Sequence, residues 1–300
     1  MDLTDAGFSP DRQDDTAPAG RPGQSGRLGG ELRRHPNLAV GGVLGAVVVL
    51  VAIVGHLAPP YNPLAINPGH ALAPPGAGRW FGTDQFGRDV FSRVLYGLGT
   101  DVVIGLIVAA LALAVGSAAG LITGYLGGWI DDIVMRVADI VMSFPSFVLA
   151  LSIAVVIGNT VRNVIIAVTI AYVPYILRLT RSSVLTARST DYVLGARAVG
   201  ASQSRVMALH VLPNAVGPPV VQATLMAGWA ILDVSGLSFL GVGIQPPSPE
   251  LGVQVAQGAS YITSGQWWIS VFPGAAIILA VLAVNFLGDY AEDKLRGPGQ

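Results

Sequence analysis

The chain has 300 residues, of which 52% are apolar and 12% are charged, and its formal net charge is −1. Soluble globular domains carry about 25% charged residues, so this composition indicates a membrane protein, and the small net charge gives no reason to expect nucleic-acid binding. The absence of cysteine excludes disulfides, thiolate metal sites and cysteine nucleophiles.

Nucleotide binding of the Walker A kind is excluded as well. That loop needs a glycine-rich turn ending in a lysine that reaches the phosphates. The sequence has a single lysine, Lys294, and it lies in the string DKLRG near the C-terminus. We therefore expect this chain to bind no ATP, and we expect no other cofactor and no metal on it.

The N-terminal part of the chain divides into a polar tail and a first helix. Residues 1–36 are rich in Gly, Pro, Asp and Arg without apolar periodicity, which predicts a disordered cytoplasmic tail. Residues 37–58 carry no charged side chain and are long enough for a transmembrane helix. A long proline-rich link follows, so we expect this first helix to be peripheral to the rest of the fold.

Residues 59–98, here called the outer segment, are predicted to lie outside the cytoplasm. The segment ends in the string RWFGTDQFGRDVFSRVLYG, which concentrates charge beside aromatic residues. Because arginine can bind a carboxylate through two parallel hydrogen bonds, we expect Arg88 and Asp89 to hold the segment in place; a solvated turn is the alternative. The candidate site residues of this segment are Gly82, Thr83, Asp84, Gly87, Arg88, Asp89 and Arg93.

Residues 99–289 are predicted to hold five further membrane helices, and residues 290–300 form a polar cytoplasmic tail. Pro145 should kink the third helix of the chain because it removes one backbone hydrogen bond. Arg136 and Asp139 share a helix face and are candidates for an ion pair. The apolar runs behind these five helices are Val102–Ile130, Ile140–Ile157, Asn163–Leu177, Asn214–Leu232 and Trp267–Gly288.

Residues 181–213 are here called the inter-helix loop, and the stretch from Asp191 to Asn214 is too polar to cross a membrane. Its string DYVLGARAVGASQSRVMALHVLPN predicts a short helix from Tyr192 to Val199 and a second helix from about Ser202 to Leu212. Gly200 separates them, because glycine takes the positive φ that ends a helix sharply. Pro213 then restricts Leu212 and should fix where the next helix begins.

Arginine and lysine are concentrated on one side of the predicted helices. They occur in the N-terminal tail, before the third helix, in the inter-helix loop and in the C-terminal tail. The positive-inside rule places this side in the cytoplasm. We therefore expect both termini and the inter-helix loop to be cytoplasmic.

Three strings resemble the membrane subunits of ABC importers. The inter-helix loop resembles their coupling-loop signature, with Leu194-Gly195-Ala196 in the place of Glu-Ala-Ala, Gly200 in the place of the glycine, and HVLP ending at Pro213. The strings FGTDQFGRDVFSRVLYG and LSFLGVGIQPPSPELG are similar to segments of the C-type permease subunits of dipeptide and oligopeptide importers. Leu194 and Val234 stand where relatives usually carry an acid.

This resemblance implies an all-α polytopic membrane protein with six transmembrane helices and the type I ABC importer permease fold, in the inner (plasma) membrane of a bacterium. It implies a non-catalytic subunit for import of di- or oligopeptides. The implied partners are a second homologous permease subunit, two ABC ATPase subunits that carry ATP and Mg²⁺, and an extracytoplasmic substrate-binding protein. The residues implied to couple to the ATPases are Tyr192, Leu194, Gly195, Ala196, Arg197, Ala198, Gly200, Ala201, Ser202, Arg205, Leu212 and Pro213.

Other functions remain open at this point. A permease of the same family for nickel or another small solute complex would show the same strings. An intramembrane enzyme would need paired catalytic groups, and His56, His210, Asp139 and Asp233 include no HExxH motif or paired-acid site. A self-contained secondary transporter predicts internal repeats, and the sequence shows no convincing one.

Overall fold

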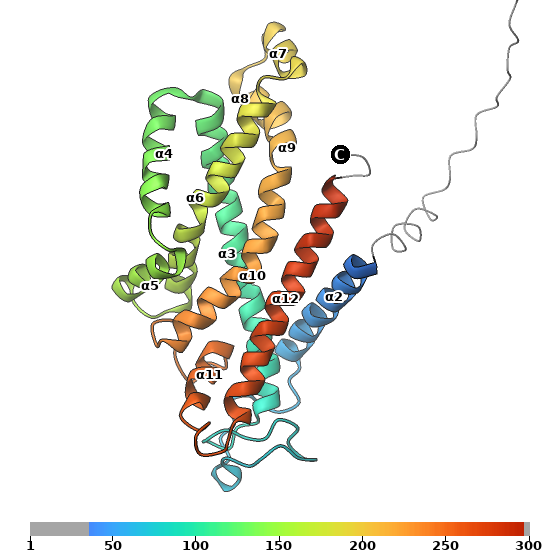
Figure 1. Cartoon of the computed structure of the whole chain (residues 1–300), viewed down its shortest axis with the longest axis vertical. Helices are drawn as coiled ribbons and strands as arrows, with labels where there is room; N and C mark the ends of the chain where they lie inside the picture. The colour runs from blue at the N-terminus through green and yellow to red at the C-terminus, as the bar shows by residue number, and fades with distance from the viewer. Residues whose placement is uncertain (1–35, 297–300) are drawn as a thin grey trace, which may run out of the picture. The chain divides into compact units, whose positions relative to one another are not determined.

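The computed structural model describes residues 36–296, and this part of the chain contains helices but no β-strand (Figure 1). Nearly all of the predicted N-terminal tail, residues 1–35, and the last four residues lie outside the described residues. The helices are α2 (Pro36–Leu57), η1 (Pro68–His70), α3 (Val90–Leu126), α4 (Gly128–Met142), α5 (Ser146–Ile157), α6 (Val161–Ala187), α7 (Asp191–Ala198), α8 (Gln203–Val206), η2 (Met207–Val211), α9 (Leu212–Ala215), α10 (Gly217–Phe239), α11 (Leu251–Ala259) and α12 (Trp268–Arg296).

Four helices in the described part of the chain are long and apolar enough to cross a membrane, namely α3, α6, α10 and the Trp268–Tyr290 part of α12. The pair α4 and α5 passes the same test together, although the two helices are bent by 92°. The helix α2 contains a shorter apolar stretch, Gly41–Leu57. The all-α membrane fold is thus confirmed, with four continuous spans and a fifth if the bent pair is one span, against six expected.

The break between α4 and α5 falls where the sequence predicts a kink. Pro145 is the residue before α5, and Ser143 ends α4. Proline lacks a backbone N–H and clashes with the carbonyl one turn earlier, so the helix cannot continue through it unbent. The sharp bend separates α4, which runs along α6, from α5, which crosses it (Figure 1).

Small residues let α3 and α6 pack closely. Gly116, Gly120 and Gly124 face α6, and a Cβ atom on Gly120 would lie 2.5 Å from the carbonyl oxygen of Leu177. Without a side chain the two backbones approach one another, as in other small-residue contacts between membrane helices. The same region of α6 contributes Ile176, fully buried, to the main apolar core between α3, α6 and α10.

Ion pairs fasten α4 to α6. Asp131 of α4 accepts hydrogen bonds of 2.6 Å from Nε and Nη2 of Arg181, and Asp139 pairs with Arg178. Asp139 is therefore paired with a residue of α6 rather than with Arg136, the candidate on its own helix. Sequence spacing identifies residues that share one helix face, but the facing helix supplies the partner here.

Several helix ends differ from those that hydropathy predicts. The helix α3 begins at Val90, not near Val102, and it includes the charged residues Arg93 and Asp101, both buried. The helix α6 continues past Leu177 to Ala187 with Pro174 inside it. A helix can thus continue through charged residues such as Arg93 and Asp101 when other parts of the fold donate to or accept from them.

The first helix packs on the edge of the described fold. A Cβ atom on Gly45 would lie 2.7 Å from the carbonyl oxygen of Ala283 on α12, and one on Gly99 of α3 would lie 2.6 Å from the carbonyl oxygen of Ala52. The ring of His56, near the end of α2, lies 4.3 Å from that of Tyr96. The contacts of α2 described here are thus with α12 and the first half of α3.

Candidate functional sites at the two ends of the helices

The inter-helix loop and the outer segment lie at opposite ends of the long helices. Figure 1 shows α7 and α8 beyond the ends of α6 and α10, while α11 and the outer segment lie at the other end. Each contains one of the two groups of residues that the sequence singled out.

A glycine-dependent cap ends α7 as the sequence predicts. Gly200 has φ +85° and donates its N–H to the carbonyl of Arg197 at 3.0 Å, while Ala201 donates to the carbonyl of Ala196 at 3.1 Å. These two bonds form the Schellman pattern of a helix C-terminus. A Cβ atom on Gly200 would meet no atom of the chain within 4 Å, so the requirement for glycine comes from its backbone conformation.

An apolar cluster fixes the loop to the ends of α3 and α6. Val193 of α7, Val206 of α8 and Val211 of η2 are fully buried, and they pack with Tyr125 of α3 and Val184 of α6. The site residues Ala196 and Ala201 are partly buried against the same cluster. The loop is therefore a folded unit held by the ends of two long helices.

The opposite side of the loop exposes apolar side chains. Tyr192 and Leu194 are about half exposed, Val199 is 85% exposed, and Leu209 is also exposed. Single exposed apolar residues are common on proteins, but a group on one short loop indicates a surface that binds another molecule. Further site residues with exposed positions in the loop are Gly195, Arg197, Ala198, Ser202, Arg205 and Pro213.

Two arginines of the loop region are engaged with the end of α3. Arg188 donates to the carbonyl oxygens of Gly124 and Tyr125, at 2.8 and 3.3 Å, and so binds backbone groups in the last turn of that helix. The guanidinium of Arg197 lies 4.8 Å from the centre of the Tyr125 ring, a cation–π contact. Arg205 is exposed, and among residues 36–296 it has no hydrogen bond, ion pair or cation–π contact of this kind.

The second helix of the loop extends further than the sequence predicts. It does not end at Leu212: α8 passes into the π-helix η2 and then into α9, which contains Pro213. The next long helix, α10, begins only at Gly217. A π turn directly before the proline gives its ring room, because the residues there are spaced for i→i+5 hydrogen bonds.

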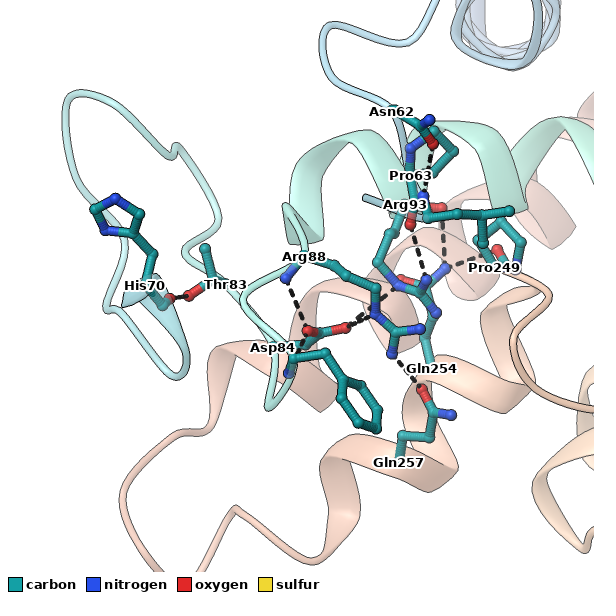
Figure 2. Close-up of polar contacts among 12 residues, drawn as sticks. Asn62, Pro63, His70, Thr83, Asp84, Arg88, Arg93, Pro249, Gln254 and Gln257 are labelled. Carbon is teal, nitrogen blue, oxygen red and sulfur yellow. Dashed lines mark hydrogen bonds and ion pairs between the residues drawn. The ribbon is translucent and has the colours of Figure 1, made fainter. Parts of the chain in front are cut away.

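At the other end, the outer segment folds around the carboxylate of Asp84 (Figure 2). Its Oδ1 accepts the backbone N–H groups of Phe86 and Arg88 at 2.9 and 3.0 Å, and its Oδ2 accepts from Nε of Arg88 at 2.6 Å. Nε of Arg93 lies 3.6 Å from the same Oδ2. Asp84 and Arg88 are each 4% exposed, so this is a buried ion pair with several supporting hydrogen bonds.

Backbone geometry explains why glycines occur in this segment. Gly82 and Gly87 have φ of +71° and +72°. A Cβ atom on Gly87 would lie 1.8 Å from the carbonyl oxygen of Asn67, and one on Gly82 would lie 2.6 Å from that of Ala73. Both positions therefore exclude other residues by conformation and by space.

Thr83 and Asp89 complete the segment. The hydroxyl of Thr83 donates to the carbonyl of His70 and accepts the N–H of Ala73 at 2.8 Å. Asp89 caps α3 by accepting the N–H of Ser92 at 2.8 Å. The structure thus brings all of the predicted outer-segment residues into one buried cluster.

The helix α11 supplies partners that the sequence did not reveal. Gln257 accepts from Nη2 of Arg88 at 3.3 Å, and Gln254 donates to the carbonyl oxygens of Arg93 and Pro249 at 2.9 and 2.8 Å (Figure 2). No local pattern marks these glutamines. Arg88 therefore ties the outer segment to α11 with Asp84 as its ion-pair partner, and Asp89 serves α3 instead.

Val234 and its neighbour Asp233 point in different directions. Val234 is fully buried in the apolar core of α10. Asp233 accepts a hydrogen bond of 2.9 Å from the hydroxyl of Tyr172 on α6. Asp233 therefore does not take the place of an acid at position 234.

The family of the chain follows from its similarity to known proteins. A family model described as "Binding-protein-dependent transport system inner membrane component" matches residues 116–297, more than half of the chain. The chain belongs to this family. Its members are permease components of transport systems, so the chain is a multi-pass inner-membrane permease component, and the expected all-α membrane class and family resemblance are confirmed.

Individual relatives are similar over most of their length. The dipeptide transport system permease protein DppC of Alkalihalophilus pseudofirmus is 39% identical over 88% of this chain and 87% of its own. The probable D,D-dipeptide transport system permease protein DdpC of Escherichia coli is 40% identical over 88% of each chain. The di/tripeptide transport system permease protein DppC of Pseudomonas aeruginosa is 38% identical over 87% of this chain and 88% of its own.

Proposed function

We propose that this chain is one of two permease subunits of an ATP-driven importer for di- or oligopeptides. In this proposal a second homologous subunit forms the other half of the pathway, and two ATPase subunits bind ATP and Mg²⁺. A binding protein outside the membrane delivers the peptide to the outer segment. Both termini lie in the cytoplasm together with the inter-helix loop.

The similarity to peptide permeases carries this proposal. Several relatives with about 40% identity over nearly the whole folded chain have peptide transport in their names. The exposed apolar side of α7, with Tyr192, Leu194 and Val199, supports an ATPase contact at the loop. Where relatives use an acid, Leu194 would bind the ATPase by burial of its apolar side chain, worth about 1.5–3 kcal/mol when complete.

Uptake by the reconstituted complex tests the proposal. The chain is purified with its co-expressed partner subunits, placed in liposomes, and given binding protein and a radiolabelled dipeptide. Uptake that requires internal ATP and is unaffected by a proton ionophore is the expected result. Uptake of a nickel complex in place of the dipeptide favours the other solute class, and uptake driven by an ion gradient without ATP contradicts the proposal.

A further inference from the structure

Two carboxyl groups are buried together where α3, α10 and α11 meet. Asp101 lies on α3, and Glu250 is the residue before α11. Both are 0% exposed. Neither belongs to the inter-helix loop or to the cluster around Asp84, and neither has a role in the proposed function above.

Hydrogen bonds occupy three of the four carboxyl oxygens. Oδ2 of Asp101 accepts the N–H of Leu251 at 3.3 Å and the hydroxyl of Ser235 at 3.4 Å. The two oxygens of Glu250 accept the N–H groups of Gly252 and Val253, at 3.0 and 2.8 Å, and so cap α11. Oδ1 of Asp101 is buried and has no partner among the described residues.

No positive charge balances the pair within the described part of the chain, because no ion pair there involves Asp101 or Glu250. The helix α11 and the loop before it contribute only uncharged residues beyond Glu250, and the stretch of α12 beside α11 has no charged residue before Asp289. The titratable and charged residues on the nearby parts of the other surrounding elements include Arg93 and Tyr96 on α3, Arg79, Asp84, Arg88 and Asp89 in the outer segment, His56 on α2 and Asp233 on α10.

Each of those residues is engaged elsewhere. Arg93 donates to the carbonyl of Pro63 and lies beside Asp84, and Asp233 accepts from Tyr172. His56 packs against Tyr96, near Gly99, whose Cβ position faces α2 and not α10. Within the described part of the chain, each of the two carboxyl groups thus has the other as its nearest unbalanced charge, and its hydrogen-bond donors are uncharged.

Two unbalanced negative charges in a buried site are strongly unfavourable, and a shared site of this kind keeps one proton. Burial raises the pKa of Glu250 to about 7, although the N–H groups of Val253 and Gly252 favour its charged form. Above that pH those donors hold a charged Glu250 in place, so the remaining proton lies on the oxygen that accepts no hydrogen bond, Oδ1 of Asp101.

We propose that Asp101 and Glu250 form a proton-binding site, which holds one proton and thereby keeps α11 attached to α3 and α10. The attachment is close: a Cβ atom on Gly252 would lie 2.1 Å from the carbonyl oxygen of Ser235. Loss of the proton places two repelling charges directly behind the first turn of α11. The same helix holds Arg88 through Gln257, so release of α11 also loosens the outer segment.

The sign of the pH effect follows from the raised pKa. A carboxyl whose pKa is raised by folding favours the folded state at low pH. That contribution is fully present below the ordinary value of 4.5 and is lost as the pH rises through about 7. The last proton of the pair is therefore still held at neutral pH and is released only in alkaline surroundings, because its loss creates a second buried charge beside the first.

Infrared spectroscopy of the full chain in lipid nanodiscs tests the site directly, without need of transport. A protonated buried carboxyl has a C=O stretching band separate from that of a carboxylate. We expect such a band in the wild type at neutral pH and its loss in alkaline solution, a weaker band at neutral pH in Asp101→Asn, and an unchanged band in the control Asp132→Asn, which removes an exposed acid. Identical spectra for wild type and Asp101→Asn at every pH would overturn the proposal.

A second variant keeps the test decisive if Asp101→Asn does not fold. Ser235→Ala retains both carboxyl groups but removes the hydroxyl that donates to Asp101. Loss of a donor to the charged form disfavours ionisation, so the band should disappear at a higher pH than in the wild type. An unchanged midpoint contradicts the proposal, because it shows that the titrating group lies elsewhere.

Discussion

Arg181 and Asp131 are joined by two parallel hydrogen bonds, each 2.6 Å long, which fasten α6 to α4 where the inter-helix loop begins. This fork-shaped geometry is the strong form of an arginine–carboxylate pair. The pair is partly exposed, with 28% of the arginine and 13% of the aspartate side chain accessible. It links α4, the first helix of the bent α4–α5 pair, to the helix that leads into the loop.

Asp131→Asn should weaken the attachment of α4. Loss of the charge-assisted bonds is expected to lower the free energy of unfolding by about 1.5–3 kcal/mol, less where solvent reaches the pair. Thermal melting of the purified chain in detergent measures the change. Arg136→Ala, an exposed residue of α4 without a partner among the described residues, should leave the melting temperature near that of the wild type. Equal loss in both variants would show that the pair contributes nothing specific.

Gly120→Val should disrupt the contact between α3 and α6. The Cβ position at Gly120 lies 2.5 Å from the carbonyl oxygen of Leu177, which is backbone and cannot move aside easily. Overpacking of this kind usually reduces stability by about 1–3 kcal/mol or more. Ala118→Val is the control, because Ala118 is exposed on the same helix. The yield of folded protein in size-exclusion chromatography distinguishes the two, and similar yields would contradict the tight contact.

Arg88→Ala should release the outer segment from α11. The change leaves Asp84 buried without its main partner, and breaking a buried pair from one side reduces stability by about 3–5 kcal/mol. We expect faster proteolysis within residues 59–89 and reduced peptide uptake with the binding protein, while basal ATPase activity remains. Arg79→Ala removes a more exposed pair, 3.5 Å from Asp89, and should have a smaller effect. Unchanged uptake in Arg88→Ala would reject this role.

Gly200→Val should uncouple ATP hydrolysis from transport. At φ +85° a residue with a Cβ is strained by roughly 1 kcal/mol or more, and a β-branched residue by more. The end of α7 should therefore change shape while the helices still insert. Peptide uptake should fall sharply, and the stimulation of ATP turnover should be lost. Both are measured on the same reconstituted complex.

The control for this change is Gly217→Val, at a glycine without positive φ whose Cβ position is also open. It should transport peptide at close to the normal rate. A normal transport rate in Gly200→Val would contradict the coupling role. A structure of the complex with residues 191–213 away from every ATPase subunit would do so as well.

Deletion of residues 1–30 should leave the complex intact. These residues lie outside the described part of the chain, and their composition predicts a tail without a fixed structure. Co-purification of the partner subunits with the shortened chain measures assembly, with the full-length chain as the reference. Loss of the partners would show that the tail is a docking element.

Local chemistry made some features predictable from the sequence. Gly200 ends α7 because its positive φ lets its own N–H and that of the next residue bond the last carbonyls of the helix. Pro145 separates α4 from α5 because proline lacks a backbone N–H and clashes with the preceding turn. The order of apolar runs likewise places α3, α6, α10 and α12 correctly along the chain.

Features that depend on distant partners were not predictable. Arg93 lies in the predicted outer segment and Asp101 lies before the apolar run of the second helix, yet both are buried in α3 because residues from α11 and its approach meet them. Gln257, the α11 residue that accepts from Arg88, is 169 positions away in sequence. Nothing in the spacing of charges within one segment indicates such a contact.

The length of α3 has a mechanical consequence. It is one helix of 37 residues, about 55 Å long at 1.5 Å per residue. Its first residue follows the cap Asp89 in the outer segment, and the carbonyls of its last turn are held by Arg188 at the start of the loop region. A continuous helix that is held at both ends links those two ends mechanically. In the proposed function, a push on the loop along the axis of α3 would therefore be passed to the outer segment about 55 Å away.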